Sequence, residues 1–209
     1  MVRQTTVVFG AAALLAACAP HPRKEGPAPP PAPYRSGPLL VGAWGAGPIR
    51  AGTPFAPGAV ERLFPGAAVR ETVLPVAGDT TTRALIVSVG GTDWLEIDDG
   101  SQSNDADDDD AAAPPAITAV RAMAGPVRGP HGEGLGLAWP KAGFDLSECD
   151  AGGERDRDTV FCARPGEGTV IYQFGVRGWD SEEMPSSAAM RAGGYLKAII
   201  WAPNGTGGS

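Results

Sequence analysis

The sequence predicts a mainly β fold: an antiparallel, β-sandwich-like domain with two short helices. Glycine and proline are frequent, at 30 and 21 of 209 residues, which indicates many turns and few long helices. Short runs of β-branched and aromatic residues recur between Gly, Pro and Asp turn signals, as is typical of antiparallel strands. In the clearest run, residues 169–174, Val170, Tyr172 and Phe174 form one face of a strand.

A short apolar segment precedes this domain. Arg3 is followed by an uncharged run over residues 7–17 that ends in Leu15-Ala16-Ala17-Cys18. The run is shorter than the ~20 apolar residues that a membrane-spanning helix needs, and small residues precede Cys18 as at a signal-peptide cleavage site. This ending resembles the lipobox of bacterial lipoproteins, in which the cysteine becomes the acylated first residue. The alternative is an ordinary signal peptide cut near Ala17 or Ala19, which would leave a soluble secreted protein.

The predicted organisation follows the chain. Residues 1–17 form the lipoprotein signal peptide, and residues 18–38 form a Pro-rich tether with the extended polyproline geometry. Residues 39–203 form a single mainly β periplasmic domain, and residues 204–209 form a disordered tail. Residues 98–115 form an acidic disordered loop within the domain, because like charges repel and nothing apolar is present to fold around.

The first half of the domain is predicted to contain strands over residues 39–44, 67–76, 83–89, 94–97 and 117–123. A short helix over residues 59–64 ends at Pro65-Gly66, and Thr53 is expected to cap its start, with Pro54 in the first turn. Gly78-Asp79 and residues 90–93 are expected to be turns between strands.

The second half repeats this order loosely. Strands are expected over residues 135–139, 159–163, 169–174 and 196–201, and a second short helix over residues 187–192. The repeat of a glycine-rich strand, a helical stretch and a strand pair about 85 residues later leads to the hypothesis that the domain consists of two related halves.

Charge and cysteine content narrow the function classes. The net charge is −7, but seven of the 24 acidic residues lie within residues 98–110. The chain shows no basic patch suited to nucleic acid, and anionic lipid headgroups are not expected to attract the domain. If Cys18 carries lipid, Cys149 and Cys162 remain, and an even remainder in an exported chain predicts a disulfide. A redox or metal pair is the alternative for these two cysteines.

The last third of the chain carries a family resemblance. Cys149 and Cys162, then Ile171-Tyr172-Gln173-Phe174, Met184-Pro185-Ser186 and Ile199-Ile200-Trp201 follow one another in order. This pattern resembles the YfeY-like family of envelope lipoproteins, whose expression is tied to the RpoE envelope-stress response. The resemblance implies a mainly β periplasmic domain on a lipid anchor, and it implies no catalytic residue. Ala19, rather than Asp, follows Cys18, which by the sorting rule for Gram-negative lipoproteins implies the outer membrane.

The expected function is therefore a non-enzymatic binding or structural role in the bacterial envelope. The membrane is the expected partner through the N-terminal lipid, the sequence indicates no cofactor or metal, and it does not identify a protein or cell-wall partner. His21 and His131 have no Cys or Ser at catalytic spacing, which disfavours nucleophilic and zinc chemistry.

Two other functions stay open. A pair such as Glu148 and Asp150 could support acid–base hydrolysis of glycans, if the fold forms a cleft around it. A small-molecule carrier would show a deep apolar pocket. Trp139, Trp179 and Trp201 are candidates for such a pocket, and core packing is the simpler role for each.

Overall fold

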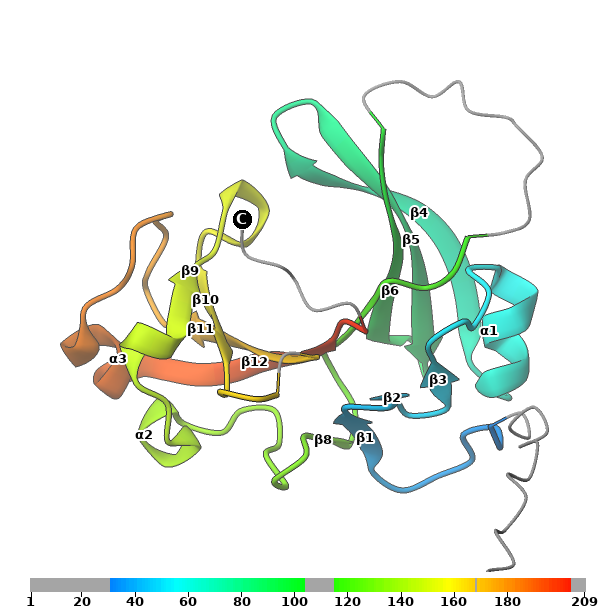
Figure 1. The fold of residues 1–209 in the computed structure, drawn as a ribbon, viewed down its shortest axis with the longest axis horizontal. Helices are drawn as coiled ribbons and strands as arrows, with labels where there is room; N and C mark the ends of the chain where they lie inside the picture. Colours follow the sequence, from blue (N-terminus) through cyan, green and yellow to red (C-terminus); the bar gives the residue numbers. More distant parts are fainter. Residues whose placement is uncertain (1–30, 104–114, 168, 204–209) are drawn as a thin grey trace, which may run out of the picture. The chain divides into compact units, whose positions relative to one another are not determined.

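The computed structural model describes residues 31–103, 115–167 and 169–203 (Figure 1). The chain divides into two compact units, Met1–Pro30 and Pro31–Ser209, and all described residues belong to the second. The predicted signal peptide, Cys18, His21 and most of the predicted tether lie outside the described residues, as do residues 104–114 of the acidic stretch and the tail.

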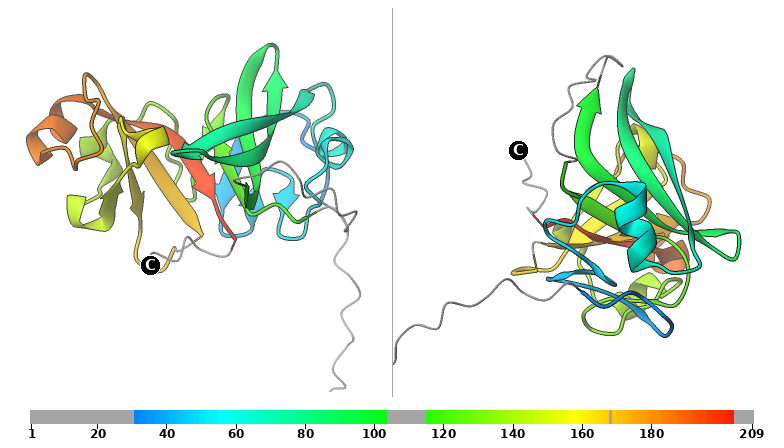
Figure 2. Two further views of the ribbon diagram at one scale, coloured as in Figure 1. Left: turned by 90° about the horizontal axis from the view of Figure 1, so that it is seen from above. Right: turned by 90° about the vertical axis from the view of Figure 1, so that its right-hand side faces the viewer.

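An eight-stranded antiparallel sheet forms the centre of the domain (Figures 1 and 2). Its spatial order is β4-β5-β6-β7-β12-β11-β10-β9. The strands are β4 (Ala68–Ala77), β5 (Thr80–Val89), β6 (Thr92–Ser103), β7 (Ala119–Ala122), β9 (Cys149–Ala151), β10 (Thr159–Ala163), β11 (Val170–Val176) and β12 (Gly194–Trp201).

This order divides the sheet into two meanders that come from the two halves of the chain. Strands β4 to β7 are neighbours in sequence order, strands β9 to β12 likewise, and the last strand of each meander pairs with the other. The register places Val120 opposite Trp201 and Ala122 opposite Ile199. This is the arrangement that two related halves would give, and the duplication stays a prediction.

A smaller sheet covers part of one face and makes the fold sandwich-like, as predicted. Its order is β3-β2-β1-β8, with β1 (Leu39–Gly42), β2 (Gly45–Ala46), β3 (Ile49–Arg50) and β8 (Val127–Arg128). Strands β1 and β2 contact β12 of the main sheet. The β1–β8 pair is parallel, with Leu39 opposite Val127, which departs from the expected antiparallel pairing. The long connection between the two strands provides the crossover that parallel pairing requires.

Both predicted helices are present, as α1 (Pro57–Leu63) and α3 (Ser187–Gly193). The predicted cap of α1 is wrong: the helix starts after Ala56, with Pro57 in its first turn, and Thr53 Oγ1 instead accepts a hydrogen bond from the Arg50 N–H. A third helix, α2 (Trp139–Ala142), lies where part of a strand was expected over residues 135–139. Pro140 is compatible with a first helical turn, and Gly143 ends the helix in the left-handed conformation.

The acidic stretch begins inside a strand rather than in a disordered loop. Strand β6 continues through residues 98–103, because β5 pairs with it as far as Thr81, which lies opposite Ser103. Asp98 pairs with Ala84 of β5 and with Ala119 of β7, so the backbone groups at this position are used by the ladder. The predicted loop boundary at residue 98 is therefore wrong, because residues 98–103 belong to β6.

The folded part also begins before the predicted boundary at residue 38. The Tyr34 N–H donates a hydrogen bond to the Leu63 carbonyl at 2.7 Å, and the Tyr34 ring packs on Phe64 and Trp94. These contacts fix the end of the Pro-rich segment against α1 and the main sheet.

The hydrophobic core lies on the face of the main sheet that the small sheet and helices cover. It includes the predicted face of β11, namely Val170, Tyr172 and Phe174, together with Leu95 and Ile97 of β6. Residues from both halves belong to one continuous cluster, which also contains Leu39, Val60, Phe64, Val120, Ala122, Trp139, Leu196 and Trp201.

Candidate functional site

The second face of the main sheet carries charged side chains that are largely buried. Successive residues of a strand point to opposite faces, so Glu96 and Arg121 face away from the core that contains Leu95 and Val120. The exposed fraction of the Glu96 side chain is 9% and that of Arg121 is 17%. Charged side chains with so little exposure to solvent require ion-pair or hydrogen-bond partners.

The partners come from the other half of the chain. Asp156, in the 3-10 helix η2 (Glu154–Asp156), accepts hydrogen bonds from both terminal nitrogens of Arg121 at 2.8 and 3.0 Å. Arg155 donates to Glu96 Oε2, and Gln173 Nε2 donates to Asp156 Oδ1 at 2.9 Å. This network, Glu96, Arg121, Arg155, Asp156 and Gln173, connects β6 and β7 to the β9–β10 loop.

The surroundings shift the pKa values of Arg121 and Asp156 in the directions that favour a fixed charge pair. Burial opposes the charge of Arg121, but hydrogen bonding and attraction to Asp156, with Glu96 nearby, raise its pKa overall. Burial likewise opposes ionisation of Asp156, but the Arg121 hydrogen bonds, with help from Gln173, lower the pKa of that carboxyl overall. In contrast, burial raises the pKa of Asp98, which accepts a hydrogen bond from Thr118.

A cavity of about 390 Å³ lies beside this network. Its volume is within the range of small-molecule sites, which are mostly apolar with a few polar groups. Asp98 and Arg121 line it, as do Glu148 and Asp150, and the other lining residues are Ala119, Phe161, Cys162, Ala163, Ile171, Ile200 and Ala202. A second cavity, of about 380 Å³, shares Asp98 and Arg121 and extends to η2.

The charge of the larger cavity is unbalanced toward negative. Arg121 is the one cationic residue that the described ranges contribute to its lining, and that guanidinium is already paired with Asp156 and Glu96. Among the described residues, no cation forms an ion pair with Asp98, Glu148 or Asp150. An apolar floor with three carboxyl groups at its edge suits a molecule with an apolar body and a positively charged group.

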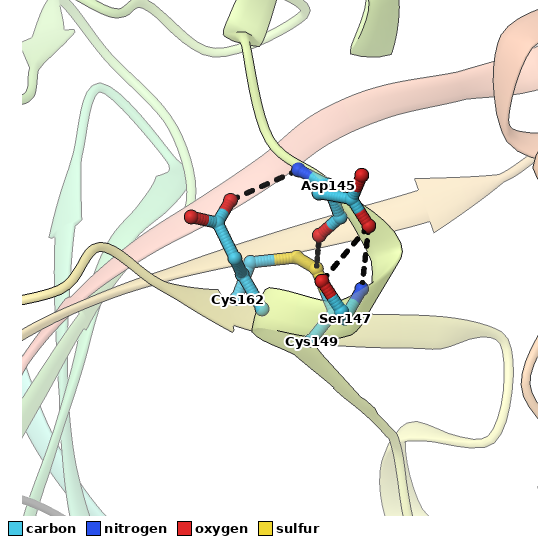
Figure 3. Close-up of a disulfide and its surroundings, with 5 residues drawn as sticks. Asp145, Ser147, Cys149 and Cys162 are labelled. Atoms are coloured by element: carbon cyan, nitrogen blue, oxygen red, sulfur yellow. Dashed lines mark hydrogen bonds between the residues drawn. A yellow bond between two sulfur atoms is a disulfide. The ribbon is translucent and has the colours of Figure 1, made fainter.

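The predicted disulfide is confirmed, and it holds one edge of this cavity. Cys149 and Cys162 are bonded and lie directly opposite each other on β9 and β10 (Figure 3). Next to it, the Asp145 carboxylate accepts hydrogen bonds from the backbone N–H and hydroxyl of Ser147. Glu148 in turn accepts from the Asp145 N–H. Glu148 and Asp150, which flank Cys149 in sequence, are therefore held at the cavity edge by this bridge and turn.

Other candidates from the sequence lie elsewhere. His131 is in an exposed turn, where its Nε2 contacts Glu167 Oε1 at 2.5 Å. Trp139 and Trp201 are buried in the core and Trp179 packs against it. Core packing is therefore the role of all three. Within the described ranges, no group of three or more His, Cys, Asp or Glu residues could hold a metal ion, and no helix has the length and apolarity to cross a membrane.

Sequence reasoning missed Glu96, Arg121 and Asp156 as a group. A signal was present, because Glu96 and Arg121 are the single charges of the strands predicted over residues 94–97 and 117–123, and a charge in that setting is usually paired. The identity of the pairing partner could not be read from the sequence, since Asp156 is one of several acidic residues in a polar loop.

No protein-family model matches this sequence, and no curated protein matches it. The fold is similar to the crystal structure of the uncharacterized protein YfeY from Escherichia coli, with a TM-score of 0.58 at 18% sequence identity. The similarity covers 79% of this chain and 99% of that chain. The predicted resemblance to the YfeY-like family is therefore confirmed for the fold.

Proposed function

We propose that this chain is a non-enzymatic envelope lipoprotein whose folded part binds a small molecule in the cavity beside Arg121. The observation that carries the proposal is the lining of that cavity, in which apolar residues meet Asp98, Glu148 and Asp150 without a free cation among the described residues. Such a site favours a ligand with an apolar body and an ammonium or guanidinium group, because the positive group would offset the carboxylates.

A pair of probes that differ in the sign of their charge tests this binding site. Decyltrimethylammonium and decyl sulfate, each below its micelle concentration, would be titrated into the protein by calorimetry. The cation should bind at least about tenfold more tightly, since one close ion pair in a partly buried site contributes at least about 1.4 kcal/mol. Equal affinity for both probes would contradict the proposed ligand class.

Two variants locate the binding. Ala119→Leu would place extra side-chain volume in the cavity and should abolish binding of the cation, whereas Asp98→Asn should weaken it. Glu71→Gln is the matched control, because it removes a carboxylate that is exposed and paired with Arg83, and it should leave binding unchanged. Binding that survives Ala119→Leu would place the probe elsewhere.

The proposed anchor rests on the sequence around Cys18, and Ala19 supports the outer membrane as its location. The decisive measurement is the mass of the protein from cells with and without globomycin, combined with membrane fractionation. We expect a mature species that starts at acylated Cys18, and loss of membrane retention in Cys18→Ser. A variant that still fractionates with membranes would contradict the anchor. The family resemblance also supports a role in envelope stress, which transcript levels after outer-membrane damage would test.

A carboxylate-dependent hydrolase is the second candidate function. It is favoured by one observation: Glu148 and Asp150 line the same cavity as Asp98, and burial raises the pKa of Asp98, as a general acid requires. Hydrolysis of aryl glycosides that is lost in both Asp98→Asn and Asp150→Asn would replace the binding role. No turnover by the intact protein would leave binding as the function.

A further inference from the structure

The small sheet exposes two large apolar side chains next to each other. Trp44, in the turn between β1 and β2, is 80% exposed, and Leu40 of β1 is 60% exposed. Both line one hollow of about 880 Å³, together with Pro31, Tyr34 and Pro48. We call this surface the Trp44 face. An exposed tryptophan beside an exposed leucine marks an interaction site more often than a single exposed residue does.

The charges around the Trp44 face are all positive among the described residues. Arg35 and Arg50 line the hollow, and no Asp or Glu of the described ranges does. A neighbouring hollow shares Tyr34 and Arg35 and adds Arg128, and the described part of the chain contributes no acidic residue to it. This is unusual in a chain with a net charge of −7, and it makes the Trp44 face complementary to an anionic surface.

The position of the Trp44 face in the chain indicates which anionic surface it meets. Pro31 lines the hollow, so the chain enters the folded part at this face. Cys18 precedes Pro31 by 13 residues, which span at most about 40 Å in an extended polyproline conformation. A lipid on Cys18 would therefore keep the Trp44 face within reach of the bilayer.

We infer that the Trp44 face contacts the headgroup region of the membrane that holds the anchor. Trp44 and Leu40 insert at the boundary between headgroups and acyl chains, where tryptophan is favoured, and Arg35, Arg50 and Arg128 meet anionic headgroups. The charge of the whole chain disfavours such contact, but this face does not share that charge. This membrane contact is separate from the proposed ligand site. It rests on the proposed anchor only because a lipid on Cys18 would place the Trp44 face near the bilayer.

Fluorescence quenching by brominated lipids tests the contact. The intact protein is purified from membranes, its mass is recorded, and it is reconstituted into vesicles of phosphatidylcholine and phosphatidylglycerol with or without bromine on the acyl chains. We expect quenching in the wild type, most of which is lost in Trp44→Phe. Trp179→Phe is the matched control, because Trp179 packs against the core, and it should leave the quenching unchanged.

The quenching results either support or contradict the membrane contact. If the acylated protein is not quenched, or if Trp44→Phe leaves quenching unchanged, the membrane contact is wrong. Protection of Trp44 from acrylamide without vesicles would instead show that a second copy or another part of the chain covers this face.

If the mass spectrum shows no acyl chain, the proposed anchor is wrong, and the membrane contact is then tested by sedimenting the same protein with anionic vesicles. The Leu40→Ser/Trp44→Ser variant should then bind at least about tenfold more weakly, and absence of sedimentation in the wild type would overturn the inference.

Discussion

At the scale of single residues, Arg121 shows how a charge becomes part of the architecture. Its strand lies at the junction of the two meanders, and its guanidinium meets Asp156 and Glu96 on the buried second face. The geometry with Asp156 uses two parallel hydrogen bonds, which is the strongest arrangement between these groups. Arg121 thereby fixes the position of η2 over the sheet, and with it one wall of the second cavity.

Replacing Arg121 by alanine should lower the free energy of unfolding by about 3 kcal/mol, because it leaves the buried Asp156 without the cation that donates to it, whereas Glu96 keeps only Arg155 as its partner. Arg70→Ala is the matched control: Arg70 makes a similar two-bond contact with Asp93, but its side chain is 54% exposed. The control should lose much less stability, because solvent screens an exposed ion pair. Urea unfolding at neutral pH measures both, and equal losses would show that burial does not distinguish the pairs.

Ionised Asp156 is expected to contribute to the free energy of unfolding, and acid should remove this contribution. Its folded pKa is lowered from the ordinary value of 3.8, so its contribution is present above 3.8 and is lost as the pH falls through the lowered value. Asp156→Asn should cost about 2 kcal/mol at neutral pH, and its stability should decline less steeply than that of the wild type between about pH 5 and pH 2. Asp79→Asn, at an exposed turn, should keep the wild-type profile. If the free energies of unfolding of the wild type and Asp156→Asn decline in parallel as the pH falls, this assignment is contradicted.

At the scale of elements, the sequence was most informative where a strand has one buried face. The alternation of residues 169–174 predicted β11 and its core face, and Gly78-Asp79 predicted the turn between β4 and β5. It was least informative for β6, because both faces of that strand are covered: Leu95 and Ile97 face the core, whereas Glu96 faces the charged network. Alternation therefore could not indicate the buried side, and the acidic composition hid the continuation to Ser103.

The disulfide is the element-scale feature with the clearest energetic consequence. It joins β9, an edge strand of three residues, to β10 across a sequence separation of 13. The Cys149→Ala/Cys162→Ala double variant should lose about 3 kcal/mol of stability, mainly because the unfolded chain regains the freedom that the bridge removes. Thermal unfolding measures the loss, and reduced wild type should behave like the variant. An unchanged melting temperature in both would show that β9 is held without the bridge.

At the scale of the whole molecule, the cavity arises from the pairing of β7 with β12. Ala119 and Arg121 come from the first meander, whereas Phe161, Ile171 and Ile200 come from the second. Sequence reasoning could propose Glu148 and Asp150 as a pair, because they are close in the chain. It could not bring Asp98 to the same cavity, since that depends on the order in which distant strands pair.

The same pairing predicts that neither half folds alone. Without the second half, β7 becomes an unpaired edge strand, and β1 loses its partner β8. Each half would also expose to solvent the apolar residues that it contributes to the shared core. Fragments 31–124 and 125–203 should each lack cooperative unfolding by near-ultraviolet circular dichroism, and mixing them should restore one transition. If fragment 31–124 instead folds as a dimer, two identical meanders can pair through β7. That result would contradict the expected dependence and would give the hypothesis of two related halves a physical route, in which an early homodimer became one chain.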